Sequence, residues 1–414
     1  MLVLSKFQKL IKQPVLFIKW VLLSVFIGLV GGLIGTAFSY TLSFVTGLRE
    51  GASWLIFLLP IGGLATVLIY YLFGLKENQG TNDIIDSVTS DKKVSFLIAP
   101  AIYLSTAITH LLGGSAGREG AALQMGGSAA SALGRALRLK KEEQTVLIMS
   151  GMSAVFAALF GTPITACLFV MEFEAVGTVF SPALMPCFLS AFAASKVAAF
   201  CGLHPEIAIQ KYSVDFKLSN SWRFILLSVL VALLGIAVCY VFHSAEHLAK
   251  KYLKNPWIRI TVGGAIITSL TLLVGSRQFN GAGMEMALDA INGNAEWYFF
   301  VLKIVFTAIT LAAGFKGGEI VPIFCIGATF GAVMGSVLGL DMSVSAALGL
   351  VGLFCSVTNS PIASIVLSIE MFGSKNFSLF VLMCVITFVL SGKGGLYEKQ
   401  ILRFKKLPAT TDAE

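Results

Sequence analysis

The chain has little charge for its length, and this scarcity excludes a water-soluble globular protein. Only 13% of its 414 residues are Asp, Glu, Lys or Arg, against about 25% in soluble domains. Hydrophobic residues make up 56%, and the mean hydropathy is +0.85. The length allows roughly ten or more spans of about 20 residues, so we expect an all-α, multi-pass protein of the cell membrane.

Motifs that the sequence lacks narrow the possible class of protein further. The seven cysteines lie singly in apolar segments and form no CxxC pair, so we expect them to pack as small hydrophobic side chains. No GK[ST] follows the glycine-rich run at residues 113–120, which excludes a phosphate-binding P-loop. We expect no cofactor and no resident metal.

The basic residues are clustered rather than spread over one face. There are 30 Lys and Arg against 22 Asp and Glu, a net charge of +8. A continuous basic face with interleaved aromatics is missing, so we expect no nucleic-acid partner. The clusters fit the excess of positive charge on cytoplasmic loops instead. They are Lys6/Lys9/Lys12/Lys19, Arg135/Arg138/Lys140/Lys141, Lys250/Lys251/Lys254/Arg259 and the tail with Lys399, Arg403, Lys405 and Lys406.

Long apolar runs alternate with short ones that glycine interrupts. Residues 1–19 form a basic cytoplasmic segment, and the uncharged run after it is too long for a signal-peptide core, so we expect it to be retained. Glycine accounts for 41 of 414 residues, about 10% against a usual ~7%. The long runs are Trp20–Val45, Trp54–Phe73, Phe224–Phe242 and Phe377–Leu390.

Three patterns recur in order about 200 residues apart, which predicts two homologous halves. We expect a first membrane repeat at 20–210, a second at 211–398 and a short cytoplasmic tail at 399–414. Interrupted helices at matching positions of two halves predict a transport site at the repeat interface. The matches are Gly80–Asp86 with Gly283–Asp289, Ala121/Gly126 with Pro322/Gly327, and Pro163/Ile164/Glu172 with Pro361/Ile362/Glu370.

Arg118 and Glu119 are charges inside an otherwise uncharged run from Val94 to Gly134. A charge at bilayer depth costs several kcal/mol unless it is paired or faces a water-filled cavity. The glycines around it, Gly117 and Gly120, would expose backbone N–H groups, which bind anions without the tight hold of a lysine. A second glycine run, Gly317–Pro322, adds a proline in the first turn of a helix. These features predict an anion pathway.

Glu119 has two interpretations. As a carboxylate beside an anion site it could occupy that site, and protonation would release it, which links anion movement to protons. Alternatively it forms a buried ion pair with Arg118, which we otherwise expect to satisfy carbonyl groups near the helix break. Glu319 is either a partner of the helix dipole or a second titrating group. Glu172 and Glu370 end apolar runs, where solvated helix ends are expected.

The order of these motifs resembles the CLC family of chloride channels and proton-coupled anion exchangers, over nearly the whole chain from Gly80 to Tyr397. GREG at 117–120 is similar to the family's gating-glutamate motif, GGEIVP at 317–322 to its GxFxP motif, and GKGGLY at 392–397 to the stretch with the pore tyrosine. The resemblance implies an all-helical homodimer with one pore per subunit between inverted repeats. It makes Glu119 the gate. The implied anion-binding residues are Thr81, Gly117, Arg118, Gly120, Gly318, Ile320, Val321 and Tyr397.

The chain also departs from the common family pattern. Thr81 stands where many members have the coordinating serine, and Ala121 replaces the proline of the gating motif. Phe173 occupies the position of the internal proton-transfer glutamate, so the resemblance implies that this proton route is either missing or rebuilt through Glu319 or Glu174. The GGE start and the altered serine motif resemble the fluoride-exporting branch. The resemblance therefore implies halide/proton antiport, with chloride as the first expectation and fluoride as the alternative.

Two rival functions come from other classes. His243, Glu246 and His247 match H-x-x-E-H, a zinc-binding pattern of membrane metalloproteases, but no third ligand follows. A transporter of small organic anions would need a larger cavity and a fixed cation, and Arg118 is the only cation that the sequence indicates at that depth.

Overall fold

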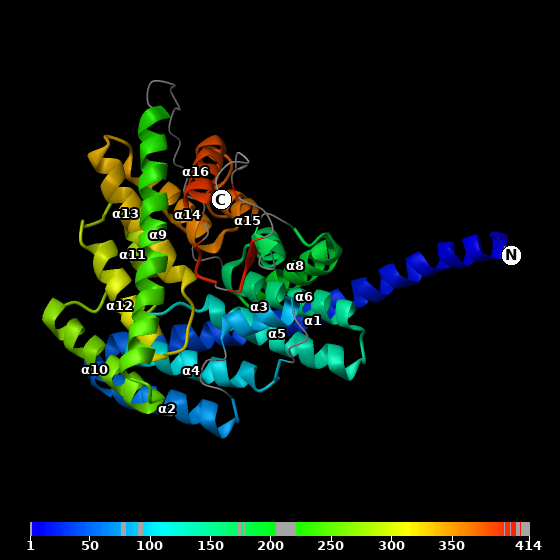
Figure 1. The fold of residues 1–414 in the computed structure, drawn as a ribbon, viewed down its shortest axis with the longest axis horizontal. Coiled ribbons are helices and arrows are strands. Elements are labelled where there is room, and N and C mark those ends of the chain that lie inside the picture. Colours follow the sequence, from blue (N-terminus) through cyan, green and yellow to red (C-terminus); the bar gives the residue numbers. More distant parts are fainter. Residues whose placement is uncertain are drawn as a thin grey trace, which may run out of the picture.

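A computed structural model describes residues 2–75, 80–89, 94–172, 175–176, 179–203, 221–392, 394–397, 399–402 and 406. For residues 2–12 and the two short strands it gives the backbone path alone. Within these ranges the protein is helical apart from one two-residue parallel strand pair (Figure 1). The helices are α1 Leu2–Gly51, α2 Leu59–Leu72, α3 Thr81–Thr89, α4 Ile98–Leu112, α5 Glu119–Ala136, α6 Lys141–Phe160, α7 Pro163–Glu172, α8 Leu184–Phe200, α9 Ser221–Tyr252, α10 Pro256–Val274, α11 Met284–Ile291, α12 Phe299–Ala313, α13 Ile320–Val337, α14 Met342–Thr358, α15 Pro361–Phe372 and α16 Phe377–Leu390, with 3₁₀ helices η1 Ser53–Leu58 and η2 Ser181–Ala183 and strands β1 Ala175–Val176 and β2 Ile401–Leu402.

Seven of the described helices are long and apolar enough to cross a membrane. They include all the long predicted runs except Phe377–Leu390, which forms the shorter α16. The apolar part of α1 has 39 residues, roughly 58 Å at 1.5 Å per residue, against a hydrocarbon core of about 30 Å. Its N-terminal end accordingly extends beyond the helical body in Figure 1.

The helices recur in order, so the predicted internal repeat is confirmed. α4 and α12 both have 15 residues, α5 and α13 both have 18, and each pair starts 201 residues apart. The short helices α3 and α11 follow the same order. The expected boundary between the repeats, at residues 210 and 211, lies outside the described residues.

Reciprocal contacts show how the two halves are related. Glu172 at the end of α7 accepts hydrogen bonds from the backbone N–H groups of Ile362 (3.2 Å) and Ala363 (2.8 Å) in α15. Glu370 in α15 accepts from Ile164 (3.0 Å) and Thr165 (2.7 Å) in α7. Exchanging the halves turns one set of contacts into the other, which is the signature of a twofold relation between them.

These contacts correct the expectation that Glu172 and Glu370 end their helices in solvent. Glu172 is only 1% exposed. Each carboxylate caps the start of the equivalent helix in the other half, where free N–H groups and the helix dipole favour a negative charge. The sequence pattern located both acids but could not indicate that they cross over.

Two sets of polar contacts mark opposite sides of the membrane. Lys19 near the basic N-terminus pairs with Glu143 at the start of α6 (2.5 Å), so the basic loop before α6 lies on the same side as the N-terminus. At the other end of α1, Arg277 donates to the carbonyl of Arg49 (3.1 Å). By the positive-inside rule, the Lys19 side is cytoplasmic and the Arg49 side is external.

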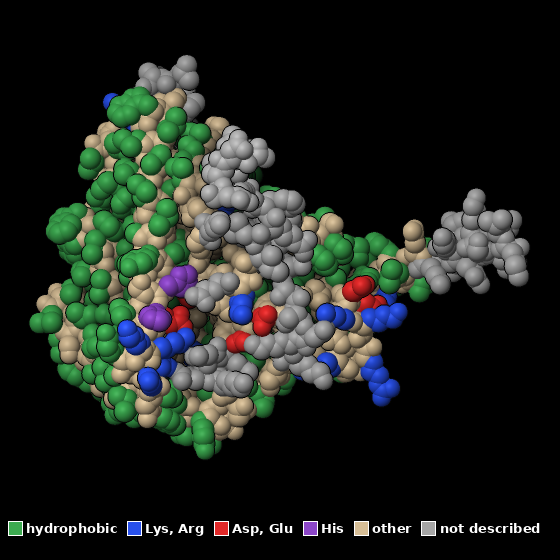
Figure 2. Space-filling view, viewed as in Figure 1, with side chains coloured by type: hydrophobic (Ala, Val, Ile, Leu, Met, Phe, Trp, Pro, Cys, Tyr) green, Lys and Arg blue, Asp and Glu red, His purple; other side chains and the backbone are tan. Residues whose placement is uncertain are grey.

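Hydrophobic side chains cover the outer flanks of the view in Figure 2, while charged and histidine side chains gather across its middle. This distribution inverts that of a soluble protein, because lipid is the solvent for the flanks. The charged band marks the part of this face that contacts water.

Candidate functional site

Two glycine loops lie at matching positions of the two halves. The first glycine loop (residues 113–118) joins α4 to α5, and the second glycine loop (residues 314–319) joins α12 to α13. Each begins with a helix-capping glycine at positive φ, 89° at Gly113 and 103° at Gly314. Only glycine adopts this conformation without strain. The chain can therefore stop one helix and start another inside the protein.

An antiparallel bridge between Gly117 and Gly318 joins the two loops. The N–H of Gly117 donates to the carbonyl of Gly318 (2.6 Å), and the N–H of Gly318 donates back to the carbonyl of Gly117 (2.8 Å). These glycines are repeat equivalents, 201 residues apart, so the bridge lies on the twofold relation between the halves. It holds the starts of α5 and α13 next to each other.

The ring of His110 supports the same loop. Its Nε2 lies 3.2 Å from the carbonyl oxygen of Gly117, a contact in which the ring nitrogen donates. The side chain is 4% exposed. Sequence reasoning missed this residue, although a polar residue in the last turn of an apolar helix, directly before a glycine run, was an available signal.

Glu119 is the first residue of α5, and its side chain is fully buried. Neither carboxylate oxygen makes a hydrogen bond within the described part of the chain. The carboxylate lies against the Cα atoms of Gly117 and Gly318, where any larger residue would collide with it. Backbone N–H groups of Arg118 and Val321 face it. A carboxylate in this cradle fills the space that a small anion would need.

A vestibule of about 700 Å³ reaches this cradle from the external side. Its buried end is formed by Arg118, Val321 and His110, and exposed residues such as Glu50 and Arg277 line its outer part. Water and ions from outside can therefore approach the starts of α5 and α13, where Glu119 is the first residue of α5.

Arg118 directly precedes Glu119, and its charge acts on the Glu119 carboxylate, whose two oxygens accept no hydrogen bond within the described residues. The guanidinium of Arg118 donates to the carbonyl of Leu159 (3.4 Å) and lies 5.6 Å from the centre of the Phe160 ring. Ile320, also named from the sequence, is fully buried in the first turn of α13.

Thr81 begins α3 and reaches the same centre. Its Oγ1 lies 2.9 Å from where a Cβ on Gly120 would be, and it accepts a hydrogen bond from Gln124 (3.3 Å). The N–H of Gly80 is capped by Asp83 (3.0 Å). The structure therefore brings the predicted hydroxyl against the first turn of α5.

Tyr397 and Glu319 lie near the same centre. Tyr397 is 6% exposed and lies within electrostatic range of Glu319 and Glu119. Glu319 is partly exposed, unlike Glu119, and also lies within electrostatic range of Glu246 on α9. The predicted route residue Glu174 and the substituted position Phe173 lie outside the described residues.

The expectation that Arg118 is the only cation at this depth is wrong. Lys303 in α12 is fully buried and donates to the carbonyls of Gly281 (2.7 Å) and Phe279 (3.2 Å) and to the hydroxyl of Ser115 (3.0 Å). Three oxygen acceptors thus satisfy its three N–H donors. The repeat-equivalent position holds Ile102, so pattern matching between the halves concealed this lysine.

The residues of the zinc-binding pattern make other contacts. His243 lies 3.4 Å from the carbonyl of Leu396, next to Tyr397, and Glu246 forms an ion pair with Lys250. Within the described ranges, no three His, Cys, Asp or Glu side chains are grouped as a metal site needs.

Comparison with known proteins places the chain in a family. Residues 62–392 match the sequence model described as "Voltage gated chloride channel". The chain belongs to this family, the CLC family. A chloride/fluoride channel protein of Pseudomonas syringae pv. tomato is 33% identical over 390 residues, covering 92% of this chain and 86% of the relative. The H⁺/Cl⁻ exchange transporter ClcA of Vibrio campbellii is 27% identical over 412 residues, covering 91% and 85%.

Solved structures of CLC proteins share the fold. The crystal structure of a CLC-type fluoride/proton antiporter has a TM-score of 0.90 at 32% identity, covering 93% of this chain and 98% of that one. A slow cyanobacterial Cl⁻/H⁺ antiporter has a TM-score of 0.77 at 19% identity, covering 90% and 94%, which supports the fold alone. The CLC architecture, with two inverted repeats of broken helices, is therefore the fold of this membrane protein.

Proposed function

We propose that this CLC protein exchanges a halide for protons, with fluoride as the favoured halide. The observation that carries the proposal is the buried, unpaired carboxylate of Glu119 at the inner end of the external vestibule. The likeness to a fluoride/proton antiporter, at 32% identity over 93% of the chain, favours fluoride over the chloride that the sequence put first.

In this proposal the anion and the Glu119 carboxylate compete for one cradle of backbone N–H groups. The deprotonated acid fills the cradle and blocks anion passage. Protonation removes its charge, and with it the attraction to the N–H groups, so the side chain leaves and an anion takes its place. Gly117 and Gly318 allow the close approach, because a Cβ at either would enter the space of the carboxylate, and a Cβ at Gly120 would meet the Thr81 hydroxyl.

Protons would reach Glu119 from the cytoplasmic side through Glu319. Glu319 is partly exposed and lies within electrostatic range of both Glu119 and Glu246. Glu174 stays an alternative carrier on sequence grounds. Thr81 and Tyr397 supply hydroxyl donors near the anion, where they would set the preference between halides.

The protein would act as a homodimer, as its family resemblance implies. Exposed apolar side chains on three helices that follow the glycine loops support this arrangement. Ile164 on α7, Phe188 on α8, Ile362 and Ile369 on α15 are 39% to 46% exposed. The replacement Ile362→Trp should shift the detergent-solubilised protein from dimer to monomer, while an intact dimer would count against this face.

The deciding experiment measures fluoride efflux, chloride efflux and internal pH together in proteoliposomes. The wild-type protein should move fluoride faster than chloride and move protons in the opposite direction. Glu119→Gln should abolish proton movement. The matched control is Glu285→Gln, because Glu285 lines the same vestibule but is exposed. Proton coupling that survives in Glu119→Gln refutes the proposal, and faster chloride efflux assigns the protein to chloride instead.

A further inference from the structure

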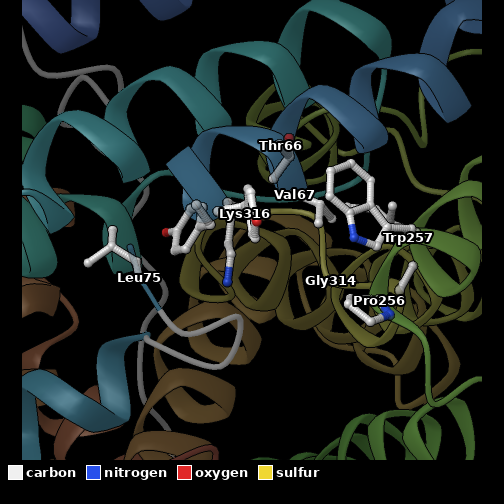
Figure 3. Close-up of a pocket in the computed structure, with 11 residues that line it drawn as sticks. Thr66, Val67, Leu75, Pro256, Trp257, Gly314 and Lys316 are labelled. Carbon is white, nitrogen blue, oxygen red and sulfur yellow. The ribbon is translucent and has the colours of Figure 1, made fainter. Parts of the chain in front are cut away.

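A second cavity, separate from the vestibule, lies between the C-terminal half of α2 and the start of α10 (Figure 3). Its volume is about 160 Å³. Val67 and Ile260 give it apolar walls, and Figure 3 places Lys316 and Trp257 on opposite sides. Neither the family resemblance nor the halide pathway gives this cavity a role.

Two polar groups in the cavity lie close together. The ammonium of Lys316 is 4.4 Å from the centre of the Tyr70 ring. Tyr70 is only 3% exposed, and its hydroxyl is buried with no hydrogen-bond partner among the described residues. A buried hydroxyl without a partner is unfavourable, so the cavity is suited to a ligand that brings an oxygen acceptor.

The cavity opens at the cytoplasmic boundary of the membrane. The last turn of α9 carries Lys250 and Lys251, and the loop before α10 carries Lys254, a basic cluster of the kind that faces the cytoplasm. Tyr71 is 73% exposed and Trp257 36%, as expected for aromatic side chains at the level of the lipid headgroups.

We propose that this cavity binds the phosphate of an anionic phospholipid from the cytoplasmic leaflet. The phosphate oxygens would accept hydrogen bonds from the Lys316 ammonium and the Tyr70 hydroxyl, and the acyl chains would run along Tyr71 and Trp257. Basic pockets between membrane helices on the cytoplasmic side bind such headgroups, and a nearby basic cluster raises the local concentration of anionic lipid.

The bound lipid would touch the segment that leads to the second glycine loop. Gly314 and Lys316 both line the cavity. The next residue, Gly317, packs so closely on the first glycine loop that a Cβ there would lie 2.9 Å from the carbonyl oxygen of Gly117. Binding therefore stabilises the junction between the two loops, and this inference holds whichever halide the protein carries.

The test titrates purified full-length protein in neutral detergent with phosphatidylglycerol or with phosphatidylcholine of the same acyl chains. Native mass spectrometry counts bound lipid, and the melting temperature reports stabilisation by mass action. Phosphatidylglycerol should raise the melting temperature and phosphatidylcholine should not. Lys316→Gln should weaken phosphatidylglycerol binding about tenfold, and Tyr70→Phe about threefold, through lost hydrogen bonds to the phosphate.

The matched control is Lys254→Gln, which removes an exposed positive charge outside the cavity. It should leave the affinity nearly unchanged. If Lys254→Gln weakens binding as much as Lys316→Gln, the attraction is a surface effect and the proposal is wrong. Should Lys316→Gln fail to fold, Tyr70→Phe decides, and unchanged affinity in that variant overturns the proposal. Equal stabilisation by inorganic phosphate would assign the cavity to a free anion rather than to a lipid.

Discussion

The two glycine loops have matching backbones and different charges. Both follow a 15-residue helix, begin with a glycine at positive φ and end in an 18-residue helix. At repeat-equivalent positions, however, Arg118 corresponds to Glu319 and Glu119 corresponds to Ile320. The fold therefore builds the same turn twice, and the chain places its fully buried acid in only the first of them.

The fold requires glycines in both loops, whereas the proposed gating requires a buried acid beside only one of them. Glycines are required in both loops, because the loops meet at the Gly117–Gly318 bridge and leave no room for side chains. A single acid per cradle is enough for gating, and a second carboxylate in the same space would repel the first. Glu319 sits one residue earlier than the equivalent of Glu119 and is partly exposed, which suits a group that exchanges protons with the cytoplasm.

The largest expected effect comes from removing the acid of the second glycine loop. Glu319→Gln should slow proton movement by about 100-fold, within the range typical of lost proton-transfer groups, because the carboxyl that would relay protons to Glu119 is gone. Internal pH recorded in proteoliposomes during halide efflux measures this. Unchanged coupling would mean that the two loops do not share one proton route.

Alanine at the two bridge glycines should have unequal effects despite their equivalence. A Cβ on Gly318 would lie 2.6 Å and 2.8 Å from the backbone nitrogens of Glu119 and Gly120, which cannot move aside. We expect Gly318→Ala to cost about 1–3 kcal/mol of stability, as overpacking does. The melting temperature of the variant in detergent measures this loss of stability.

Gly117→Ala is the equivalent variant in the first glycine loop, to be compared with Gly318→Ala. The nearest atoms to its Cβ all belong to the Glu119 carboxyl group, which can rotate away. Stability should fall by less than about 1 kcal/mol, while halide efflux becomes less dependent on pH because the acid is pushed from its cradle. Equal destabilisation by the two alanines would contradict the asymmetry of the bridge.

Lys303 offers another comparison between the two halves, because the first half has Ile102 at the equivalent position. Lys303→Met removes the donor to the carbonyls of Phe279 and Gly281, while the Ser115 hydroxyl keeps its contact with Thr307, and each buried, unsatisfied group costs about 1–3 kcal/mol. Removing the buried ammonium offsets part of this. We expect a net loss of about 2 kcal/mol in thermal melts, against little change for the exposed control Lys254→Met. An unchanged melting temperature would show that the lysine does not join the two halves.

A last comparison tests the reciprocal caps. Glu172→Gln should destabilise the protein by about 1–2 kcal/mol, because a neutral amide accepts hydrogen bonds from helix N–H groups less strongly than a carboxylate does. Glu370→Gln should cost less, since Glu370 is more exposed than Glu172. Chemical or thermal denaturation in detergent can rank the two variants, and the reverse order would contradict the role of burial.

Much of the fold was predictable from the sequence because it depends on short-range rules. Apolar runs of sufficient length must become membrane helices, since lipid offers no partners for free backbone groups. Paired glycines and recurring motifs located the breaks in those helices and the internal repeat. The same rules singled out Glu119, because an uncompensated charge within an apolar run is costly wherever the chain folds.

The contacts between the halves were decided only by the tertiary structure. The reciprocal caps made by Glu172 and Glu370 and the hydrogen bond from Lys303 to Ser115 join residues that no local pattern connects. Hydrogen-bond partners in a buried interface depend on which backbone atoms packing leaves free. That information belongs to the assembled helices, because it arises only when both repeats are folded against each other.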